Sequence, residues 1–504
     1  MQERQRVIIT TDMEVDDMNS IIHLALYLNH IDLEAIVYTA SQYHFQGDGI
    51  HTLGEVNPHW RTKGVRSYEC AVVPREPDPE AGALRRYRPF PERWIENLWE
   101  REYAQAYPNL QANAQVAGEP AFPTPEELIA RTYVGNVAFE GDVREDTPGS
   151  DAIKRAIMDD DPRTLWLLSW GGMNTIVRAL MSIAAEYVET PLWEDVRERV
   201  YTKVRVLGVM DGVGQDNSWK DYGEPLFPKL QLLRTPFPYG RYVDAKSAQP
   251  DSIELFRAPW PAQNLIEGNG PLMERYMLYG DGKIYENEPD RFQFGIHATL
   301  DWGWPGVEPM RFERGDFMAE GDSTTYIPLL DFGLRGAGDP SFDTVLGPTF
   351  RDGDTPSVEG APMGLDSLGK PANHNVNPFL RAYQEDFAAR AQWCAHKPEE
   401  CSHPARIENA TADCEASAGE RIELKAQVID PDGAGFDATW TVSPHSSSYR
   451  EVEDLASWCV RRVQGTFTVP ADAQTGDRFV LTLSVKTRGK RPCTRYSQVA
   501  VTVR

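Results

Sequence analysis

The feature that most constrains this chain is a repeated alternation between short β-rich runs and helical patterns, which occupies about the first 390 residues. Strands that alternate with helices in this way are typical of a mostly parallel sheet that helices cover on both faces. We therefore predict an α/β domain with a doubly wound sheet. Its expected strands are 6–10, 33–40, 164–170 and 203–210, and its expected helical segments are 16–29, 92–106, 124–132, 150–158, 173–187, 323–334 and 377–394.

After residue 404 the pattern changes to an alternation of apolar and polar residues with turn residues between the runs. Several short strands at this spacing are typical of an immunoglobulin-like (Ig-like) sandwich of about 100 residues. We therefore divide the chain into an α/β domain over 1–396, a linker over 397–404 and an all-β Ig-like domain over 405–504.

The charge of the chain disfavours several classes of partner. The 504 residues include 51 basic and 76 acidic side chains, which gives a formal net charge of −25. Such a surface cannot displace counterions from nucleic-acid phosphates, and it is repelled by anionic membranes. No apolar run approaches the roughly 20 residues of a membrane span. A small glycoside, a polysaccharide or a cation is compatible with this charge, and assembly into a homo-oligomer is left open.

One short stretch concentrates negative charge where an expected strand meets an expected helix. Asp12, Glu14, Asp16 and Asp17 lie within six positions. Acids at a helix start cap free N–H groups and complement the helix dipole, which would explain Asp16 and Asp17. Capping does not explain Asp12 and Glu14. Because ligands of open parallel sheets gather beyond the carboxyl ends of the strands, and calcium prefers clustered oxygen ligands, a cation site is favoured.

Two further junctions could converge with this acidic stretch. Gly171 and Gly172 precede Asn174 at the end of an expected strand, and the run 320–323 (EGDS) precedes another helical segment. From the residue types alone, a glycine-permitted turn with Asn or Thr as an N-cap explains the first junction. Capping by Asp322 or Ser323 explains the second equally simply.

These three segments resemble a known family. The run 10–26 (TTDMEVDDMNSIIHLAL) is similar to the N-terminal aspartate motif of the nucleoside hydrolases, and SWGGMNTIVRAL is similar to their G-P-L-T-N segment. The chain resembles still more closely a nucleoside-hydrolase-like family with a C-terminal Ig-like module, some of whose members are labelled cellulose-binding proteins. The segments WGGMNT, EGDS, FLRAYQEDFAARAQWC, DPDG and PCTRYSQVAVTV carry this resemblance, which spans almost the whole chain.

The resemblance implies a calcium-dependent hydrolase. Asp12 matches the aspartate that ligates Ca2+ and deprotonates the attacking water, and Asp17 and Asp322 match two further calcium ligands. Asn174 matches a position that lends its backbone carbonyl to the metal, and Asp16 matches the carboxylate that grips a sugar hydroxyl. The implied reaction is attack of an activated water on an anomeric carbon, through a transition state that resembles an oxocarbenium ion.

The departures from the family pattern concern the substrate. The leading aspartate of the motif is Thr10 in this chain, and Glu14 replaces the usual glycine, so an extra carboxylate could bind the metal or occupy the sugar site. Gly321 stands where nucleoside hydrolases often place a histidine that protonates the leaving base. We therefore expect a calcium-dependent hydrolase of an N- or O-glycoside other than a nucleoside. The alternative is a non-catalytic protein that binds carbohydrate, such as a cellulose-like polysaccharide, on the same scaffold.

Two loops that follow expected strands supply further candidate contacts to sugar hydroxyls. A solvated loop explains the first of them equally well, and a lone histidine, as in the second, is more often structural. The candidates are Asp211, Asp216, Asn217 and Trp219 in the first loop, and Gln42, Tyr43 and His44 in the second.

The distribution of cysteines leaves the cellular compartment open. Cys394, Cys401, Cys414, Cys459 and Cys493 lie in the last quarter, which favours disulfides and export, although their odd number suits reduced thiols in a cytoplasm nearly as well. Cys394 and Cys401 could pair or stay free, and a zinc site with His396 and His403 fits no strong spacing pattern. Because the chain enters a strand at once, no signal peptide is visible. We expect a secreted or periplasmic protein if a signal peptide has been removed, and a cytoplasmic one otherwise.

Overall fold

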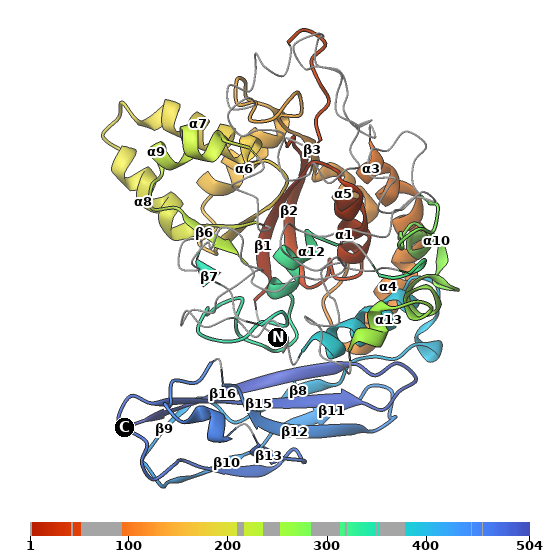
Figure 1. Ribbon diagram of the computed structural model, residues 1–504, viewed down its shortest axis with the longest axis vertical. Coiled ribbons are helices and arrows are strands. Elements are labelled where there is room, and N and C mark those ends of the chain that lie inside the picture. Colours follow the sequence, from red (N-terminus) through yellow and green to blue (C-terminus); the bar gives the residue numbers. More distant parts are fainter. Residues whose placement is uncertain are drawn as a thin grey trace.

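The computed structural model describes residues 3–41, 44–51, 93–208, 216–234, 252–283, 313–317, 320–347, 350–351, 379–444, 446–455 and 457–504. These residues form an N-terminal α/β domain and a C-terminal β-sandwich, which lies below the α/β domain in Figure 1. Both parts of the predicted fold class are therefore confirmed. None of the described helices has both the length and the apolarity required to cross a lipid bilayer.

The α/β domain is centred on a seven-stranded sheet with the order β3-β2-β1-β4-β5-β6-β7. The strands from β3 through to β6 pair in parallel, and β7 pairs with β6 in the antiparallel direction. Because β1 lies between β2 and β4, the loops that follow these three strands meet at one edge of the sheet. The strands are β1 (Gln5–Thr11), β2 (Ile31–Tyr38), β3 (Thr132–Val134), β4 (Leu165–Trp170), β5 (Val204–Gly208), β6 (Gln231–Arg234) and β7 (Phe350–Arg351).

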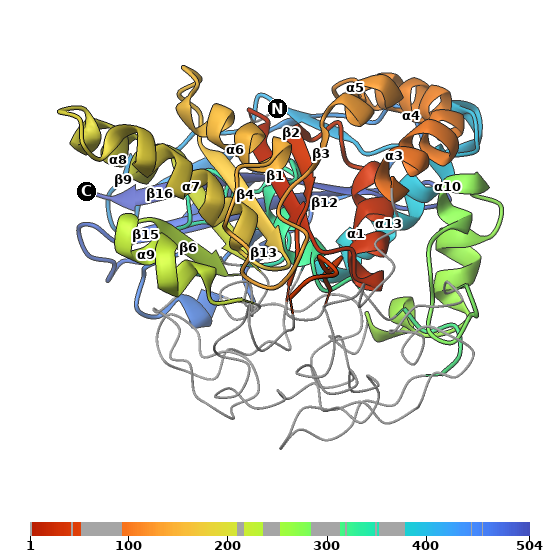
Figure 2. The same cartoon turned by 90° about the horizontal axis from the view of Figure 1, so that it is seen from above.

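Helices cover both faces of this sheet. Figure 2 shows α6, α7, α8 and α9 on one side of the strands and α1, α3, α4, α10 and α13 on the other. Residues of β1 alternate between the two layers, with Val7 and Ile9 in the core beside α1 and α13, and Ile8 in the core beside α6 and α7. The helices are α1 (Val15–Ala25), α3 (Trp94–Leu98), α4 (Ala104–Ala117), α5 (Pro125–Ala130), α6 (Pro148–Met158), α7 (Asn174–Tyr187), α8 (Trp193–Lys203), α9 (Glu224–Leu226), α10 (Gly270–Glu274), α12 (Ser323–Tyr326) and α13 (Leu380–Trp393).

Several elements differ from the expectation in their extent. The helix expected over 16–29 ends at Ala25, and residues 26–30 form turns that lead into β2. The helix expected over 92–106 continues to Ala117 through a π-helical segment, Trp99–Tyr103. The helical segment expected over 323–334 is reduced to α12 and a short 3-10 turn, because Pro328 has no N–H to donate to a continuing helix.

The C-terminal domain is a β-sandwich with its own core. A five-stranded sheet in the order β13-β12-β15-β16-β9 packs with the pairs β10-β14 and β11-β8. Trp440 is fully buried in this core, and Trp458 is partly buried against it. The strands are β8 (Arg406–Glu408), β9 (Cys414–Ala416), β10 (Arg421–Leu424), β11 (Gln427–Ile429), β12 (Phe436–Val442), β13 (Cys459–Val460), β14 (Gly465–Thr468), β15 (Arg478–Thr487) and β16 (Thr494–Val503).

The two domains are joined by a set of buried charges, which we call the interdomain ion-pair network: Glu119, Asp386, Arg390 and Arg495. Arg495 of β16 reaches the α/β domain, where its Nη1 lies 2.7 Å from Asp386 Oδ2 and its Nη2 lies 3.0 Å from Glu119 Oε1. Arg390 of α13 pairs with both carboxylates as well. Each carboxylate therefore faces two guanidinium groups, and the sandwich is tied to the α/β domain through them.

Candidate metal and substrate site

The tight connection between β1 and α1 places Asp12 at the carboxyl end of the central strand. Met13 adopts a left-handed backbone conformation with φ 64°, which reverses the chain within two residues. Its N–H donates to Thr11 Oγ1 at 3.1 Å, and the Glu14 N–H lies 3.4 Å from Asp12 Oδ1. Hydrogen bonds between residues two positions apart therefore hold the loop, and Asp12 and Glu14 are kept close together.

Asp16 and Asp17 lie in the first turn of α1, where their charge complements the helix dipole, but no side-chain cap is formed. The N-cap of α1 is Glu14, whose side chain makes no capping hydrogen bond. Asp17, in the first turn, instead accepts a very short hydrogen bond from the hydroxyl of Thr11 at the end of β1. The carboxylate of Asp17 is thus directed back toward the strand end, where Asp12 lies.

Asp322 comes from a distant part of the chain and joins these acids. A Cβ atom at the preceding Gly321 would lie only 2.6 Å from Asp16 Oδ2, so the two loops are in direct contact. The charge of Asp322 is also the strongest electrostatic influence on Asp17. The structure therefore brings together one group of residues, which we call the acidic cluster: Asp12, Glu14, Asp16, Asp17 and Asp322.

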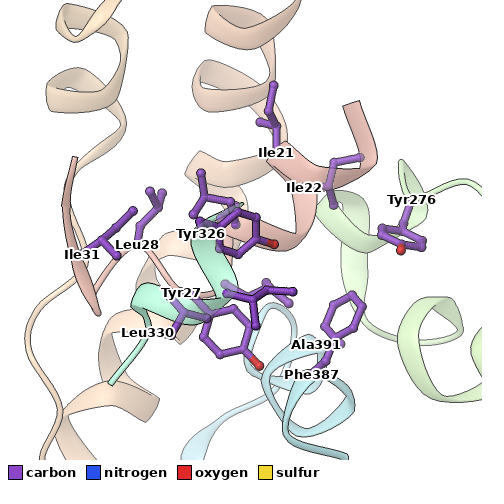
Figure 3. Packing of buried hydrophobic residues seen from close by; sticks show 14 of the residues in the cluster. Ile21, Ile22, Tyr27, Leu28, Ile31, Tyr276, Tyr326, Leu330, Phe387 and Ala391 are labelled. Carbon is purple, nitrogen blue, oxygen red and sulfur yellow. The ribbon is translucent and has the colours of Figure 1, made fainter. Parts of the chain in front are cut away.

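The turn that carries Asp322 is anchored to the sheet. Trp170, the last residue of β4, donates from Nε1 to Thr325 Oγ1 at 2.6 Å, and that hydroxyl donates to the backbone oxygen of Asp322 at 2.8 Å. Tyr326 of α12 is buried in the same core as Tyr27 and Phe387, as Figure 3 shows. The position of Asp322 is thus determined by strand β4 and by the core beneath it.

A network of buried hydrogen bonds, which the sequence did not predict, lies behind the acidic cluster. Glu320 and His23 are both fully buried, and Glu320 Oε2 lies 2.6 Å from His23 Nδ1. Glu320 also accepts very short hydrogen bonds from the hydroxyls of Tyr276 and Ser323. Ser323 in turn contacts Ser20 of α1 at 3.0 Å. These contacts hold the 320–323 turn against α1, and the one local signal for them was a histidine within the apolar face of that helix.

The two glycines after β4 are required by close packing. A Cβ atom at Gly171 would lie 2.9 Å from the Cβ atom of Asp12, and one at Gly172 would lie 2.2 Å from the backbone oxygen of Ala40. The side chain of Asn174 does not cap α7. It accepts a hydrogen bond from Thr39 and donates to the backbone oxygens of Asn136 and Asp142. These glycines and Asn174 therefore join the loops after β2, β3 and β4 around the acidic cluster.

Charge in the acidic cluster is poorly balanced within the described part of the protein. Asp12 and Asp17 are 0% and 1% exposed, and the Oδ2 atom of each is buried without a hydrogen-bond partner. Burial, and then the charges of Asp322, Asp12 and Asp16, raise the pKa of Asp17 well above its usual range. Among the described residues, no lysine or arginine forms an ion pair with Asp12 or Asp17, although His44 Nδ1 lies 3.5 Å from Asp12 Oδ2.

These features fit a bound hard cation. An unpartnered buried carboxylate oxygen is costly, and a calcium ion would satisfy several such oxygens at once. Asp12, Asp17 and Asp322 could hold the ion. A calcium site built from Asp12, Asp17 and Asp322 requires that the loop after β1 and the turn of Asp322 lie together at one edge of the sheet. The structure places them together there.

The other candidate residues are spread more widely. Gln42, Tyr43 and Asp211 lie outside the described residues. Asn217 is described beside the fully buried Asp216, whose Oδ2 atom accepts the N–H of Asn174 at 2.9 Å. Trp219 is 5% exposed and belongs to the hydrophobic core on the α6 and α7 face.

The described C-terminal cysteines belong to none of the groups of potential metal ligands. All five described cysteines are free, so neither the disulfide nor the zinc alternative has support. His403 is committed to Asp432 and to Asn113, and His396 contacts the backbone oxygen of Gly268. The described groups of potential metal ligands lie instead at the carboxyl ends of β1 and β2 and the start of α1, and they combine Asp12, Glu14 and His44, or Glu14, Asp16 and Asp17.

Comparison with known proteins assigns the family. Residues 6–347 match the family model described as "Cellulose-binding Sde182, nucleoside hydrolase-like domain". The chain belongs to this family. The match includes every member of the acidic cluster, so the cluster is part of the nucleoside-hydrolase-like domain and not an addition to it.

A solved structure supports the same fold. The nucleoside hydrolase-related hypothetical protein from Saccharophagus degradans, which is described as associated with carbohydrate metabolism, is 21% identical, and the match covers 100% of both chains with a TM-score of 0.64. A cohesin–dockerin complex from Clostridium thermocellum, 12% identical, covers 20% of this chain and 100% of that chain with a TM-score of 0.12, which is too low to bear on the fold. No curated protein matches the chain.

Proposed function

We propose that this nucleoside-hydrolase-like protein is a calcium-dependent hydrolase of glycosidic bonds. The observation that carries the proposal is the convergence of Asp12, Asp17 and Asp322 at the carboxyl end of β1, with two buried carboxylate oxygens that have no hydrogen-bond partner. Burying several carboxylates together costs folding free energy unless a cation compensates for their charge.

Each residue has a chemical task in the proposed reaction. Asp17 and Asp322 would hold the ion together with Asp12 and the backbone carbonyl of Asn174. When bound, calcium supplies a positive charge that offsets the carboxylates and acidifies a neighbouring water. Asp12 would accept the proton of the attacking water, and Asp16, in the first turn of α1, would hold a sugar hydroxyl.

The surroundings of Gly321 suggest which leaving groups are suitable. A side chain at this position would collide with Asp16 Oδ2, so a histidine cannot take the place beside Asp322 without displacing Asp16. Departure of a glycosidic leaving group usually needs an acid. We therefore expect the enzyme to prefer substrates whose leaving group departs as a stable anion, such as aryl glycosides of acidic phenols, over nucleosides.

The test is a panel of nitrophenyl glycosides and nucleosides assayed with the full chain, with calcium and after treatment with a chelator. We expect turnover of at least one aryl glycoside that is lost with the chelator and restored by calcium. Asp12→Asn should reduce turnover by about 100-fold or more without lowering the melting temperature. Asp48→Asn, which alters a carboxylate in the neighbouring loop, should behave as wild type. Absence of turnover across the panel with calcium bound would refute the proposal.

A second candidate function is non-catalytic carbohydrate binding, and a different region favours it. A cavity of about 620 Å³ lies between the two domains, lined by charged and polar side chains such as Arg335 and Gln498 together with apolar ones such as Ile407. Arg4 and His30, which precede β1 and β2, also line it, so the cavity lies at the opposite end of the strands from the acidic cluster. A concave site whose polar groups can form hydrogen bonds with hydroxyls suits a sugar.

The two functions are separable by one substitution in each region. Ser497→Trp would fill part of the interdomain cavity, since Ser497 is one of its lining residues. If the second function holds, this variant loses retention on insoluble cellulose while Asp12→Asn keeps it. Retention that is unaffected by Ser497→Trp, in a protein whose melting temperature is unchanged, would exclude the cavity as the binding site.

A further inference from the structure

The imidazole of His44 lies beside Asp12 and Glu14, two members of the acidic cluster. It follows β2, and its backbone is held by a turn in which the Ser41 N–H donates to the His44 oxygen at 2.9 Å and the His44 N–H contacts Ser41 Oγ at 3.2 Å. Because β2 is the neighbour of β1, this turn lies beside the acidic loop, and the Thr39 N–H donates to the Thr11 oxygen at 2.8 Å. The sheet thus fixes the position of the imidazole.

The distances from His44 to the two carboxylates are too long for a tight ion pair, and they match the spacing between two ligands of one metal ion. Its Nδ1 atom lies 3.4 Å from Glu14 Oε1 and 3.5 Å from Asp12 Oδ2. Charge-assisted hydrogen bonds are shorter, at about 2.7–2.9 Å. Nitrogen and oxygen ligands bind zinc at about 2.0–2.2 Å, which places them about 3.3–3.5 Å apart in a tetrahedral site. The observed spacing therefore corresponds to the edge of such a tetrahedron.

An independent observation also indicates a ligand at this point. Asp12 Oδ2, which lies 3.5 Å from His44 Nδ1, is completely buried and has no hydrogen-bond partner. One ligand atom each from Asp12, Glu14 and His44 lies within 4.8 Å of the others. A cation between them would satisfy the buried oxygen and would remove the repulsion between the two carboxylates.

We propose that Asp12, Glu14 and His44 form a site for a divalent transition ion of the zinc class, distinct from the calcium position. Calcium takes oxygen ligands, whereas an imidazole nitrogen selects softer ions such as zinc, cobalt or nickel. Glu14 and His44 take no part in the proposed calcium set, and only Asp12 is common to both. Glu14 also lies within reach of Asp16 and Asp17, so the two positions are neighbours that share carboxylates.

The experiment measures metal content and affinity in the full chain, independently of activity. Metal-stripped protein is titrated with zinc in the presence of saturating calcium, and the bound metal is counted by elemental analysis. Cobalt serves as a second probe, because its visible absorption bands report tetrahedral coordination with nitrogen. Wild type should take up one equivalent of zinc. His44→Gln and Glu14→Gln should each weaken zinc binding at least about tenfold, since loss of even the groups that orient metal ligands weakens affinity on that scale.

Matched variants separate this site from the proposed calcium site. His51→Gln removes another histidine that contacts a carboxylate, Asp48, at 2.6 Å, and it should leave zinc uptake unchanged. Asp322→Asn should weaken calcium binding but retain zinc. Equal zinc uptake by wild type and both His44→Gln and Glu14→Gln, or no uptake at micromolar zinc, would overturn the proposal. Failure to bind calcium with normal zinc uptake would instead overturn the proposed function alone. Melting temperatures establish that each variant is folded.

Discussion

The acidic cluster and the interdomain ion-pair network both bury carboxylates, but they differ in what stands beside them. In the network, Arg390 and Arg495 face Glu119 and Asp386 directly. In the cluster, the main charged neighbours of Asp17 are the carboxylates of Asp322, Asp12 and Asp16. Guanidinium groups therefore compensate the buried carboxylates of the network, whereas no described lysine or arginine pairs with Asp12 or Asp17 in the cluster.

The pKa directions express the same difference. Burial alone would raise the pKa of Glu119, but Arg390, His30 and Arg495 more than offset it and hold the pKa well below its usual range. For Asp17, burial and its carboxylate neighbours act together and raise the pKa. Fixed internal cations are typical of a structural contact, and uncompensated carboxylates are typical of a site that binds a cation. Burial of an acid therefore does not by itself distinguish a structural contact from a binding site, and the countercharge found among the described residues is what separates these two regions.

The largest expected effect comes from breaking the compensated region. Arg390→Met removes a guanidinium that is 1% exposed and leaves Glu119 and Asp386 partly unpaired, so the free energy of unfolding should fall by roughly 3–5 kcal/mol. Chemical denaturation at pH 7 measures this change. Arg488→Ala, which breaks the exposed pair with Asp437, serves as the control and should leave the denaturation midpoint unchanged. Equal effects of the two substitutions would show that the network is not structurally important.

The opposite sign is expected in the acidic cluster. Asp17→Asn keeps an oxygen that can accept from Thr11 but removes one of the repelling charges, so the metal-free protein should become more stable by roughly 1–4 kcal/mol. Calcium at 100 times its dissociation constant should stabilise wild type by about 2.7 kcal/mol and this variant hardly at all. Thermal melts with calcium and with a chelator test both statements. The exposed Asp195→Asn is the control, and a destabilised metal-free Asp17→Asn would contradict the comparison.

A smaller effect is expected behind the cluster. Glu320→Gln weakens the buried contact with His23 that holds the turn of Asp322 against α1. Calcium affinity should fall by about tenfold, or about 1.4 kcal/mol, because groups that orient ligands contribute on that scale. Titration calorimetry of the full chain measures the affinity, with the exposed Asp339→Asn as the control. Unchanged affinity in a folded Glu320→Gln protein would mean that Asp322 is positioned without this network.

Much of the fold follows from local patterns. The strands β1, β2, β4 and β5 are apolar runs between helical segments, and their order in the chain was sufficient to predict a doubly wound sheet. Element ends were less predictable, because turns such as 26–30 and the lack of a donor at Pro328 depend on single residues. The family resemblance, and not the spacing, connected Asp322 to the first loop.

The remaining interactions could not be predicted because they join residues that no local pattern connects. His23 and Glu320 are 297 positions apart, and Arg495 meets Glu119 across 376 positions. The partners of such charges are decided by tertiary packing. His44 illustrates the same limit, since its proximity to Asp12 depends on the pairing of β1 with β2, and from the sequence it was a lone histidine with a structural explanation.

The smallest expected effect sharpens the comparison through its pH dependence. Because the folded-state pKa of Glu119 is depressed below the ordinary value of 4.5, its contribution to stability is fully present above that pH and is lost as the pH falls toward the folded-state pKa. Over the first pH unit below 4.5, this one group should cost wild type roughly 1 kcal/mol. Glu119→Gln starts less stable but lacks this component, so its stability should fall less steeply in denaturation series from pH 6 to pH 3. Parallel slopes in the two proteins would mean that the charge of Glu119 is not stabilised by its arginine partners, and the contrast with Asp17 would then fail.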